Sequence, residues 1–271
     1  MKLSFFKKII LLLLVLFTSQ TFAQKFQGKA YYFSKSKMEL GNWGARMSEA
    51  QKKQIQNRLK NRLEKKYILS FNMQESTFLE EDKIDAISGA TDSWGGYFSR
   101  GDLHKNIKND KLIQSQEFYG KRFLVKDDLL KIEWSLGTET KKIGNYTCYK
   151  AAAMIPKSEL SWFDFSWSDL RQNFEDEKKE EPLIVIEAWY TPQIPVAQGP
   201  AEYWGLPGLI LEVSAGNTTL LCSELILNPK EKINIIAPDK GVSITKKEYA
   251  SNIRKKMIEM RNNRMGRRRG R

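Results

Sequence analysis

Alternating apolar and polar residues dominate the chain between its two ends. In YILSFNM, Tyr67, Leu69, Phe71 and Met73 alternate with smaller or polar residues, which is the period of a strand with one buried face. The connections between such runs are short and rich in Gly, Asn and Asp, which favours antiparallel hairpins. The pattern predicts strands at 29–33, 67–73, 112–119, 122–125, 129–134, 146–155, 183–190, 209–213, 218–227 and 233–236.

Two segments have helical spacing instead. Within residues 47–66, Ser48 and Gln51 form a capping box, and Ile55, Leu59 and Leu63 recur every four residues. The apolar stripe is narrow and the other faces are basic, so we expect this helix to lie on the surface and to touch the body along one edge.

The second helix is predicted near the end of the chain. Thr245 and Glu248 form another capping box, and Tyr249, Ile253, Met257 and Met260 follow at helical spacing. The sequence after Met260, RNNRMGRRRGR, has no apolar stripe to pack, so we expect order to be lost there.

These elements predict a mainly β fold of the α+β kind. We expect a curved antiparallel sheet or open half-barrel, with an N-terminal amphipathic helix and a basic C-terminal helical tail. No linker rich in Gly, Ser or Pro divides the chain, so 24–244 is predicted to be one domain and 245–271 the tail.

Residues 1–23 have the layout of a secretory signal peptide. Lys2, Lys7 and Lys8 precede an apolar stretch at 9–17, and small residues end at Ala23. The rest of the chain has no second apolar run of membrane length. We therefore predict an exported protein, periplasmic or associated with the outer membrane, that does not span the membrane after cleavage.

The positive charge is concentrated in the tail. The formal net charge is +13, and residues 246–271 hold eleven basic side chains against Glu248 and Glu259. Export argues against nucleic acid as a partner and favours an anionic envelope surface; a solvated, disordered tail is the alternative. The basic residues predicted to contact an anionic surface are Arg254, Lys255, Lys256, Arg261, Arg264, Arg267, Arg268, Arg269 and Arg271.

Two cysteines, Cys148 and Cys222, lie in predicted strands. Because export leads to an oxidising compartment, a disulfide between them is predicted. Two buried thiols packed as small apolar groups are the alternative.

The stretch EYWGLPGLILEV, residues 202–213, combines a turn with an apolar strand. Pro207 presets φ and Gly208 can adopt the positive φ of a type II turn, so Gly205, Pro207 and Gly208 are predicted as the structural turn. Prolines at 192, 195 and 200 exclude a regular ladder from the preceding loop.

The chain resembles the GLPGLI family of exported proteins from Bacteroidota, named for the hexapeptide that stands here at 205–210. The resemblance also includes KKYILSFNMQESTF at 65–78, FLVKDDLLKIEW at 123–134, KKIGNYTCYKA at 141–151 and AWYTPQIPVAQGP at 188–200. It implies no established enzyme activity. It implies an envelope role beside outer-membrane TonB-dependent receptors, and a layout similar to lipoprotein-sorting chaperones with a half-open barrel.

Few residues suggest catalysis. The only histidine, His104, lies in a polar stretch and is expected to be solvated, and no nucleophile elbow or metalloprotease helix is present. Glu187 and Glu212 interrupt apolar strands, so on one face they could bind a cation or ligand, or act as acid and base. Alternatively, each points to solvent or pairs with a lysine or arginine.

Aromatic residues flank the proline-rich loop at both ends. Trp189, Tyr190, Tyr203 and Trp204 could line an apolar pocket or anchor an interface. They could equally pack the loop onto the sheet.

The sequence thus predicts a non-enzymatic envelope binding or accessory protein without metal or cofactor. Its partner would be an apolar or amphipathic ligand, such as a lipid or peptide, or an outer-membrane receptor, held by these aromatic residues with Glu187 and Glu212. The alternative is a carboxylate-based hydrolase or metal-handling protein that uses the two glutamates.

Overall fold

A computed structural model describes residues 26–37, 46–81, 100–162 and 181–269. The predicted signal peptide at 1–23 lies outside this part of the chain. Among the described residues, no helix has both the length and the apolar character needed to cross a membrane.

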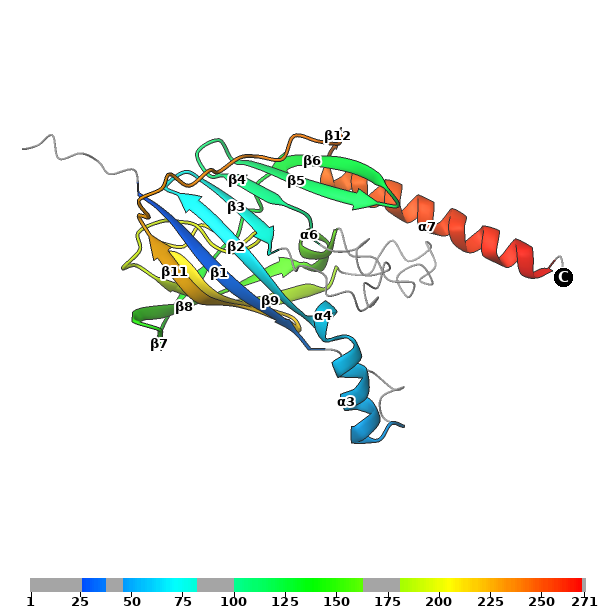
Figure 1. Cartoon of the computed structure of the whole chain (residues 1–271), viewed down its shortest axis with the longest axis horizontal. Helices are drawn as coiled ribbons and strands as arrows, with labels where there is room; N and C mark the ends of the chain where they lie inside the picture. The colour runs from blue at the N-terminus through cyan, green and yellow to red at the C-terminus, as the bar shows by residue number, and fades with distance from the viewer. Residues whose placement is uncertain (1–25, 38–45, 82–99, 163–180, 270–271) are drawn as a thin grey trace, which may run out of the picture.

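The described strands form one sheet, which Figure 1 shows to be strongly twisted and curved. Its order is β12-β6-β5-β4-β3-β2-β1-β11-β10-β9-β8-β7. Neighbours pair antiparallel except β12 and β6, which are parallel. The strands are β1 (Gln27–Ser36), β2 (Glu64–Asn72), β3 (Glu75–Glu80), β4 (Leu103–Asn106), β5 (Lys111–Phe118), β6 (Lys121–Asp128), β7 (Ser135–Ile143), β8 (Tyr146–Pro156), β9 (Leu183–Thr191), β10 (Leu209–Ala215), β11 (Thr218–Leu227) and β12 (Val242–Ile244).

The prediction of a mainly β fold is confirmed, and the sheet is largely antiparallel, with β12 and β6 as its parallel pair. β12 comes from a long connection after β11 that returns to β6, so the short strand meets β6 in the same direction. Gly241, with φ +139°, leads into the pairing, and a Cβ there would lie 2.7 Å from the Phe123 carbonyl carbon.

The core lies on the inner face of the sheet. Ala30 and Tyr32 of β1 are buried beside Leu69 of β2, while the residues between them are partly exposed, as alternation requires. The loop between β9 and β10 adds Ile194, Val196 and Leu206 to this core. Each such side chain contributes about 1.5 to 3 kcal/mol when it is fully buried.

Segment 129–134 is not the strand predicted from its apolar content. It links β6, near one edge of the sheet, to β7, which forms the other edge. Leu129 and Leu130 are consecutive and both buried, which a strand with one buried face does not allow. Segment 233–236 is also not a strand, since Ile233 is buried but Ile236 is 74% exposed and pairs with no strand.

A second, smaller core joins the C-terminal helix to one side of the sheet. Helix α7 (Lys246–Arg269) presents Tyr249, Ile253 and Met257 to Phe123 and Val125 of β6. The ring of Tyr249 meets Phe123 and Trp162 edge to face, with centroids 5.3 and 5.5 Å apart. The predicted capping box is present, because the Glu248 amide donates to Thr245 Oγ1 and the Thr245 amide to Glu248 Oε2. The helix continues to Arg269, past Met260, the last residue of the predicted apolar stripe.

In the described part of the chain, three short helices lie between strands. Helix α3 (Glu49–Arg58) has the predicted capping box at Ser48 and buries none of its residues. Helix α4 (Lys60–Leu63) follows after a break at Leu59, and β2 begins at once, so the helical region ends earlier than predicted. Figure 1 shows α3 projecting away from the sheet. Helix α6 (Lys157–Ser161) follows β8 directly.

Candidate functional site

The loop between β9 and β10, residues 192–208, folds back on the inner face of the sheet. Two tight turns centre on prolines: the Val196 amide donates to the Ile194 carbonyl, and the Gly208 amide to the Leu206 carbonyl, each at 2.8 Å. A hydrogen bond that skips one residue is a γ-turn, and the φ fixed by proline suits its common inverse form. The loop is therefore stiff, as its prolines predicted.

The predicted type II turn at Leu206–Leu209 is wrong in its details. Gly205, not Gly208, has the positive φ, at +92°. Gly208 is needed for a different reason, since a Cβ there would lie 2.2 Å from the Thr191 carbonyl oxygen. The turn packs directly against the end of β9, which leaves no space for a side chain.

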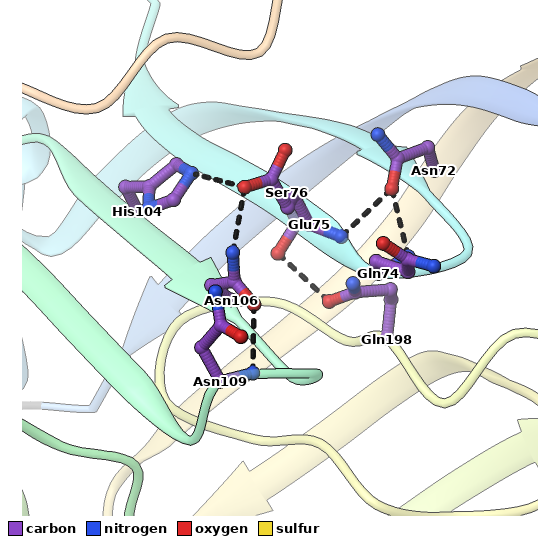
Figure 2. A network of polar contacts seen from close by, with 8 residues as sticks. All are labelled: Asn72, Gln74, Glu75, Ser76, His104, Asn106, Asn109 and Gln198. Atoms are coloured by element: carbon purple, nitrogen blue, oxygen red, sulfur yellow. Dashed lines mark hydrogen bonds and ion pairs between the residues drawn. The ribbon is translucent and has the colours of Figure 1, made fainter.

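Polar side chains of the sheet hold the loop in place. Lys105 on β4 is fully buried, and its Nζ donates to the carbonyls of Gly199 and Tyr203 at 2.7 and 3.0 Å. Ser76 donates to Gln198 Oε1 at 2.8 Å (Figure 2). The Tyr32 hydroxyl donates to the Ile210 carbonyl just after the loop. The two bonds from Lys105 satisfy buried carbonyls of the loop, which lies outside the strands.

Burial changes the chemistry of Lys105. Loss of hydration disfavours its charged form and lowers its pKa to about 7, although nearby Glu202 opposes this shift. Glu202, buried in the loop, pairs with Arg100. The sequence showed only that Lys105 is a lysine between polar residues, so pattern analysis missed it.

His104 lies on β4, next to Lys105 but on the other face, where it is buried rather than solvated as predicted. Its Nε2 is 3.8 Å from Glu75 Oε1, which also accepts from Asn106 at 2.7 Å (Figure 2). Burial lowers the pKa of His104 and Glu75 opposes the shift, so the ring is neutral near pH 7.

The predicted aromatic residues lie in packed positions. Trp189, Tyr190 and Tyr203 are 6 to 7% exposed, and Trp204 packs against the main core. Trp204 Nε1 donates to the Leu130 carbonyl, and Trp134 Nε1 donates to the Trp204 carbonyl, each at 2.8 Å. These contacts correspond to the alternative in which the rings fix the loop and its surroundings.

The two predicted carboxylates share the outer face of β9 and β10, and each is paired with a lysine. Glu212 lies 2.8 Å from Lys141, and Glu187 lies 3.0 Å from Lys150. Both ammonium groups also stand over the Trp189 ring, at 4.3 and 5.7 Å from its centroid. The hydrogen bond from Lys150 lowers the pKa of Glu187. The described residues contain no group of three His, Cys, Asp or Glu that could hold a metal ion.

The predicted disulfide is absent, because Cys148 and Cys222 are both free thiols. They lie on β8 and β11, which β9 and β10 separate in the sheet. Three strand spacings of about 4.8 Å exceed the Cα separation of about 7 Å that a disulfide tolerates. Burial raises the pKa of Cys148 to about 11 and that of Cys222 to about 12, so both remain protonated.

A hollow of about 720 Å³ opens where α7 begins, between the end of β6, the end of β8 and α6. Its apolar lining includes Leu129, Leu130, Ile155, Trp162 and Ala250. Its charged lining consists of Asp127, Asp128, Lys131, Glu159, Lys246 and Lys247. This combination suits a ligand with an apolar body and a polar end.

The loop and the hollow are connected through the floor of the hollow. Leu130 lines the hollow, and its carbonyl accepts the indole hydrogen bond of Trp204. The Lys246 amide, at the first turn of α7, donates to Asp127 Oδ2 at 3.0 Å and fixes the helix beside the hollow. Sequence analysis predicted the capping box and the aromatic residues, but not that 129–131 and 246–250 would meet.

Of the predicted anionic-surface residues, Arg254, Lys255 and Lys256 are exposed on α7, and Arg261 is partly exposed. The side chains of Arg264, Arg267, Arg268 and Arg269 lie outside those the structure describes, as does Arg271 entirely.

Residues 134–212 match the model of a protein family described as a protein of unknown function, Porph_ging. The match begins at Trp134, includes the whole loop and ends at Glu212 on β10. It covers less than half of the chain, so membership of the GLPGLI family stays a prediction. The comparison with curated proteins found no match.

Two solved structures are distantly similar to this fold. They are PNGF-II in the C2 space group, with a TM-score of 0.48, and PNGF-II in the P21 space group, with 0.45, both at 14% identity. The alignments cover 83% and 80% of this chain but 32% and 31% of those chains, so the chain spans about a third of PNGF-II. Similarity at this level carries no argument about function.

Proposed function

We propose that this chain is an exported envelope protein that binds an amphipathic ligand in the hollow beside α7 without catalysing a reaction. The observation that carries the proposal is the hollow of about 720 Å³, with buried leucines on its floor and charged residues around it. Its size lies within the range of about 300 to 1,000 Å³ typical of small-molecule sites.

The lining indicates how such a ligand would lie. Leu129, Leu130 and Ile155 are at most 9% exposed, so the floor is apolar and firmly packed. Lys246 and Lys247 line the hollow from the first turn of α7 and could contact an anionic head group. We therefore expect an acyl chain or similar apolar body with an acidic end.

Export is supported by the predicted signal peptide at 1–23 and by the resemblance to GLPGLI proteins. In this proposal the curved sheet is a half-open barrel whose interior is occupied by the loop at 192–208. The ligand is therefore placed beside α7, at the side of the packed interior, and the aromatic residues act indirectly by holding the floor.

The alternative function at Glu187 and Glu212 has less support. Each carboxylate is paired with a lysine on the outer face, and neither is among the residues that line the hollow. The hydrogen bond from Lys150 lowers the pKa of Glu187, which makes this carboxylate a weaker base.

Filling the hollow tests the proposal. Ala250 lines it from α7, so Ala250→Trp should exclude the ligand, whereas Ser251→Trp adds the same ring at the neighbouring, exposed position. In a titration with a fluorescent fatty acid, we expect wild type and Ser251→Trp to bind alike and Ala250→Trp to bind at least about tenfold more weakly, a difference of about 1.4 kcal/mol. Equal binding by all three proteins, or no saturable binding by wild type, would overturn the proposal.

A further inference from the structure

Two basic helices extend from the same end of the sheet. Helices α3 and α4 lie in the connection from β1 to β2, and successive strands from β1 to β6 alternate in direction. The β5–β6 hairpin therefore lies at the same end as α3. Helix α7 starts beside Asp127 and packs against Phe123 and Phe118 next to this hairpin, and Figure 1 shows both α3 and α7 projecting at this end.

Helix α3 has little in the described structure to stabilise it. None of its residues is buried, and its internal support is the capping box at Ser48 and the exposed pair of Glu49 with Lys52 at 2.7 Å. Isolated helices shorter than about 12 to 15 residues are marginal in water. A helix of ten residues that stands away from the core is therefore expected to gain stability from a partner.

The charge of α3 indicates the chemistry of that partner. It carries Lys52, Lys53 and Arg58 against one acidic residue, Glu49, and Lys53 and Arg58 are exposed. Ile55 is only partly buried, so the helix has a small apolar contact beside its basic groups. Exposed basic side chains suit the anionic headgroup region of a membrane.

Helix α7 is also basic on the side that faces away from the sheet. It contains ten lysines and arginines against Glu248 and Glu259. Tyr249, Ile253 and Met257 face the sheet, whereas Arg254, Lys255 and Lys256 are exposed. The fold thus attaches one side of the helix to the sheet and leaves these basic side chains exposed on the other side.

We propose that α3 and the exposed basic side of α7, with Arg254, Lys255 and Lys256, form one bipartite docking surface for an anionic lipid bilayer. The two helices approach the surface from the same end of the sheet, so both sets of basic residues can bind at once. Simultaneous attachment through two linked groups raises affinity well above that of either alone. This surface is separate from the hollow and does not depend on the ligand proposed for it.

The test compares charge reversals on each helix. Two double variants are compared with wild type: Lys53→Glu with Arg58→Glu on α3, and Arg254→Glu with Lys255→Glu on α7. Their affinity for vesicles of phosphatidylglycerol and phosphatidylcholine is measured by co-sedimentation. All variants are made as the mature protein, whose first residue is determined by mass spectrometry. Each basic residue near an anionic surface contributes about fivefold in affinity, or about 1 kcal/mol. Each double variant should therefore bind at least about 25-fold more weakly, and wild-type binding should fall steeply with salt.

The matched control reverses two exposed lysines elsewhere. Lys108 lies in the β4–β5 connection and Lys142 near the end of β7, at the opposite end of the sheet, so Lys108→Glu with Lys142→Glu changes the net charge equally. It should lose less than about threefold. Equal losses in all three variants would show that net charge alone drives binding. A loss confined to the α7 variant, or binding only to an acidic protein and not to vesicles, would also overturn the bipartite lipid surface.

Discussion

Replacing Lys105 by methionine removes both hydrogen bonds that its Nζ donates from β4 to the loop carbonyls of Gly199 and Tyr203. Two buried carbonyls would then lack partners, at about 1 to 3 kcal/mol each. We expect Lys105→Met to lower the free energy of unfolding by about 2 to 4 kcal/mol at pH 9, as measured by urea titration. Lys142→Met, at an exposed position, should change it by less than about 0.5 kcal/mol. Similar values for the two variants would contradict the role given to Lys105.

The lowered pKa of Lys105 predicts that the stability of the fold depends on pH. Its pKa is lowered to about 7 in the folded protein from 10.5, so between these values the unfolded chain binds more protons than the folded one. The free energy of unfolding therefore gains a contribution as pH rises through this window, and loses it as pH falls. The difference between wild type and Lys105→Met should grow from pH 7 to pH 10. A constant or shrinking difference would refute the shift.

Glycine is required at position 208 for space and not for φ. Gly208→Ala would place a Cβ 2.2 Å from the Thr191 carbonyl, so we expect a loss of about 3 kcal/mol in unfolding free energy. Gly144→Ala is the comparison, because Gly144 has φ +57° and a Cβ added there would meet no atom within 4 Å. This variant should lose about 1 kcal/mol in unfolding free energy. If Gly144→Ala were the more damaging in thermal unfolding, backbone conformation rather than contact would decide at these glycines.

At the scale of elements, the two helices with predicted capping boxes differ in what holds them. Ile253 of α7 is 2% exposed in the second core, whereas no residue of α3 is buried. Ile253→Ala should destabilise the protein by about 3 kcal/mol and Ile55→Ala by less than about 0.5 kcal/mol. Denaturation monitored by circular dichroism distinguishes these values, and a large effect of Ile55→Ala would mean that α3 packs firmly.

Strands with alternation or an apolar run were predicted, whereas β3, β4, β7 and β12 were not. β1, β2, β5, β8 and β11 carry clear alternation, and the predicted ranges overlap them closely. β7 is an edge strand whose first six residues are all exposed, so nothing in SLGTETKKI signals a buried face. β4 buries His104 and Lys105, which a pattern of apolar residues cannot detect.

The candidate site was predictable only in part for a similar reason. The sequence indicated a stiff loop and aromatic residues beside it, and both are present. It could not indicate that Trp204 would bond the carbonyl of Leu130, since that contact joins residues 74 positions apart. The hollow depends on such long-range contacts among β6, β8 and α7, which local periodicity does not contain.

At the scale of the whole molecule, the loop fills the inside of the curved sheet and the C-terminal helix closes one side of it. The interior beneath the loop is packed with Ile194, Val196 and Leu206, and the open volume lies where α7 joins the sheet. The proposed ligand site and the proposed lipid-docking surface therefore both depend on α7, through its first turn and through its exposed basic side respectively.

The central claim, that the hollow beside α7 holds an amphipathic ligand, is tested most directly by native mass spectrometry of protein isolated from the envelope. Wild type and Ser251→Trp should carry a bound mass that organic solvent releases, and Ala250→Trp should carry none. Absence of such a mass from wild type, or its equal presence on Ala250→Trp, would contradict the account.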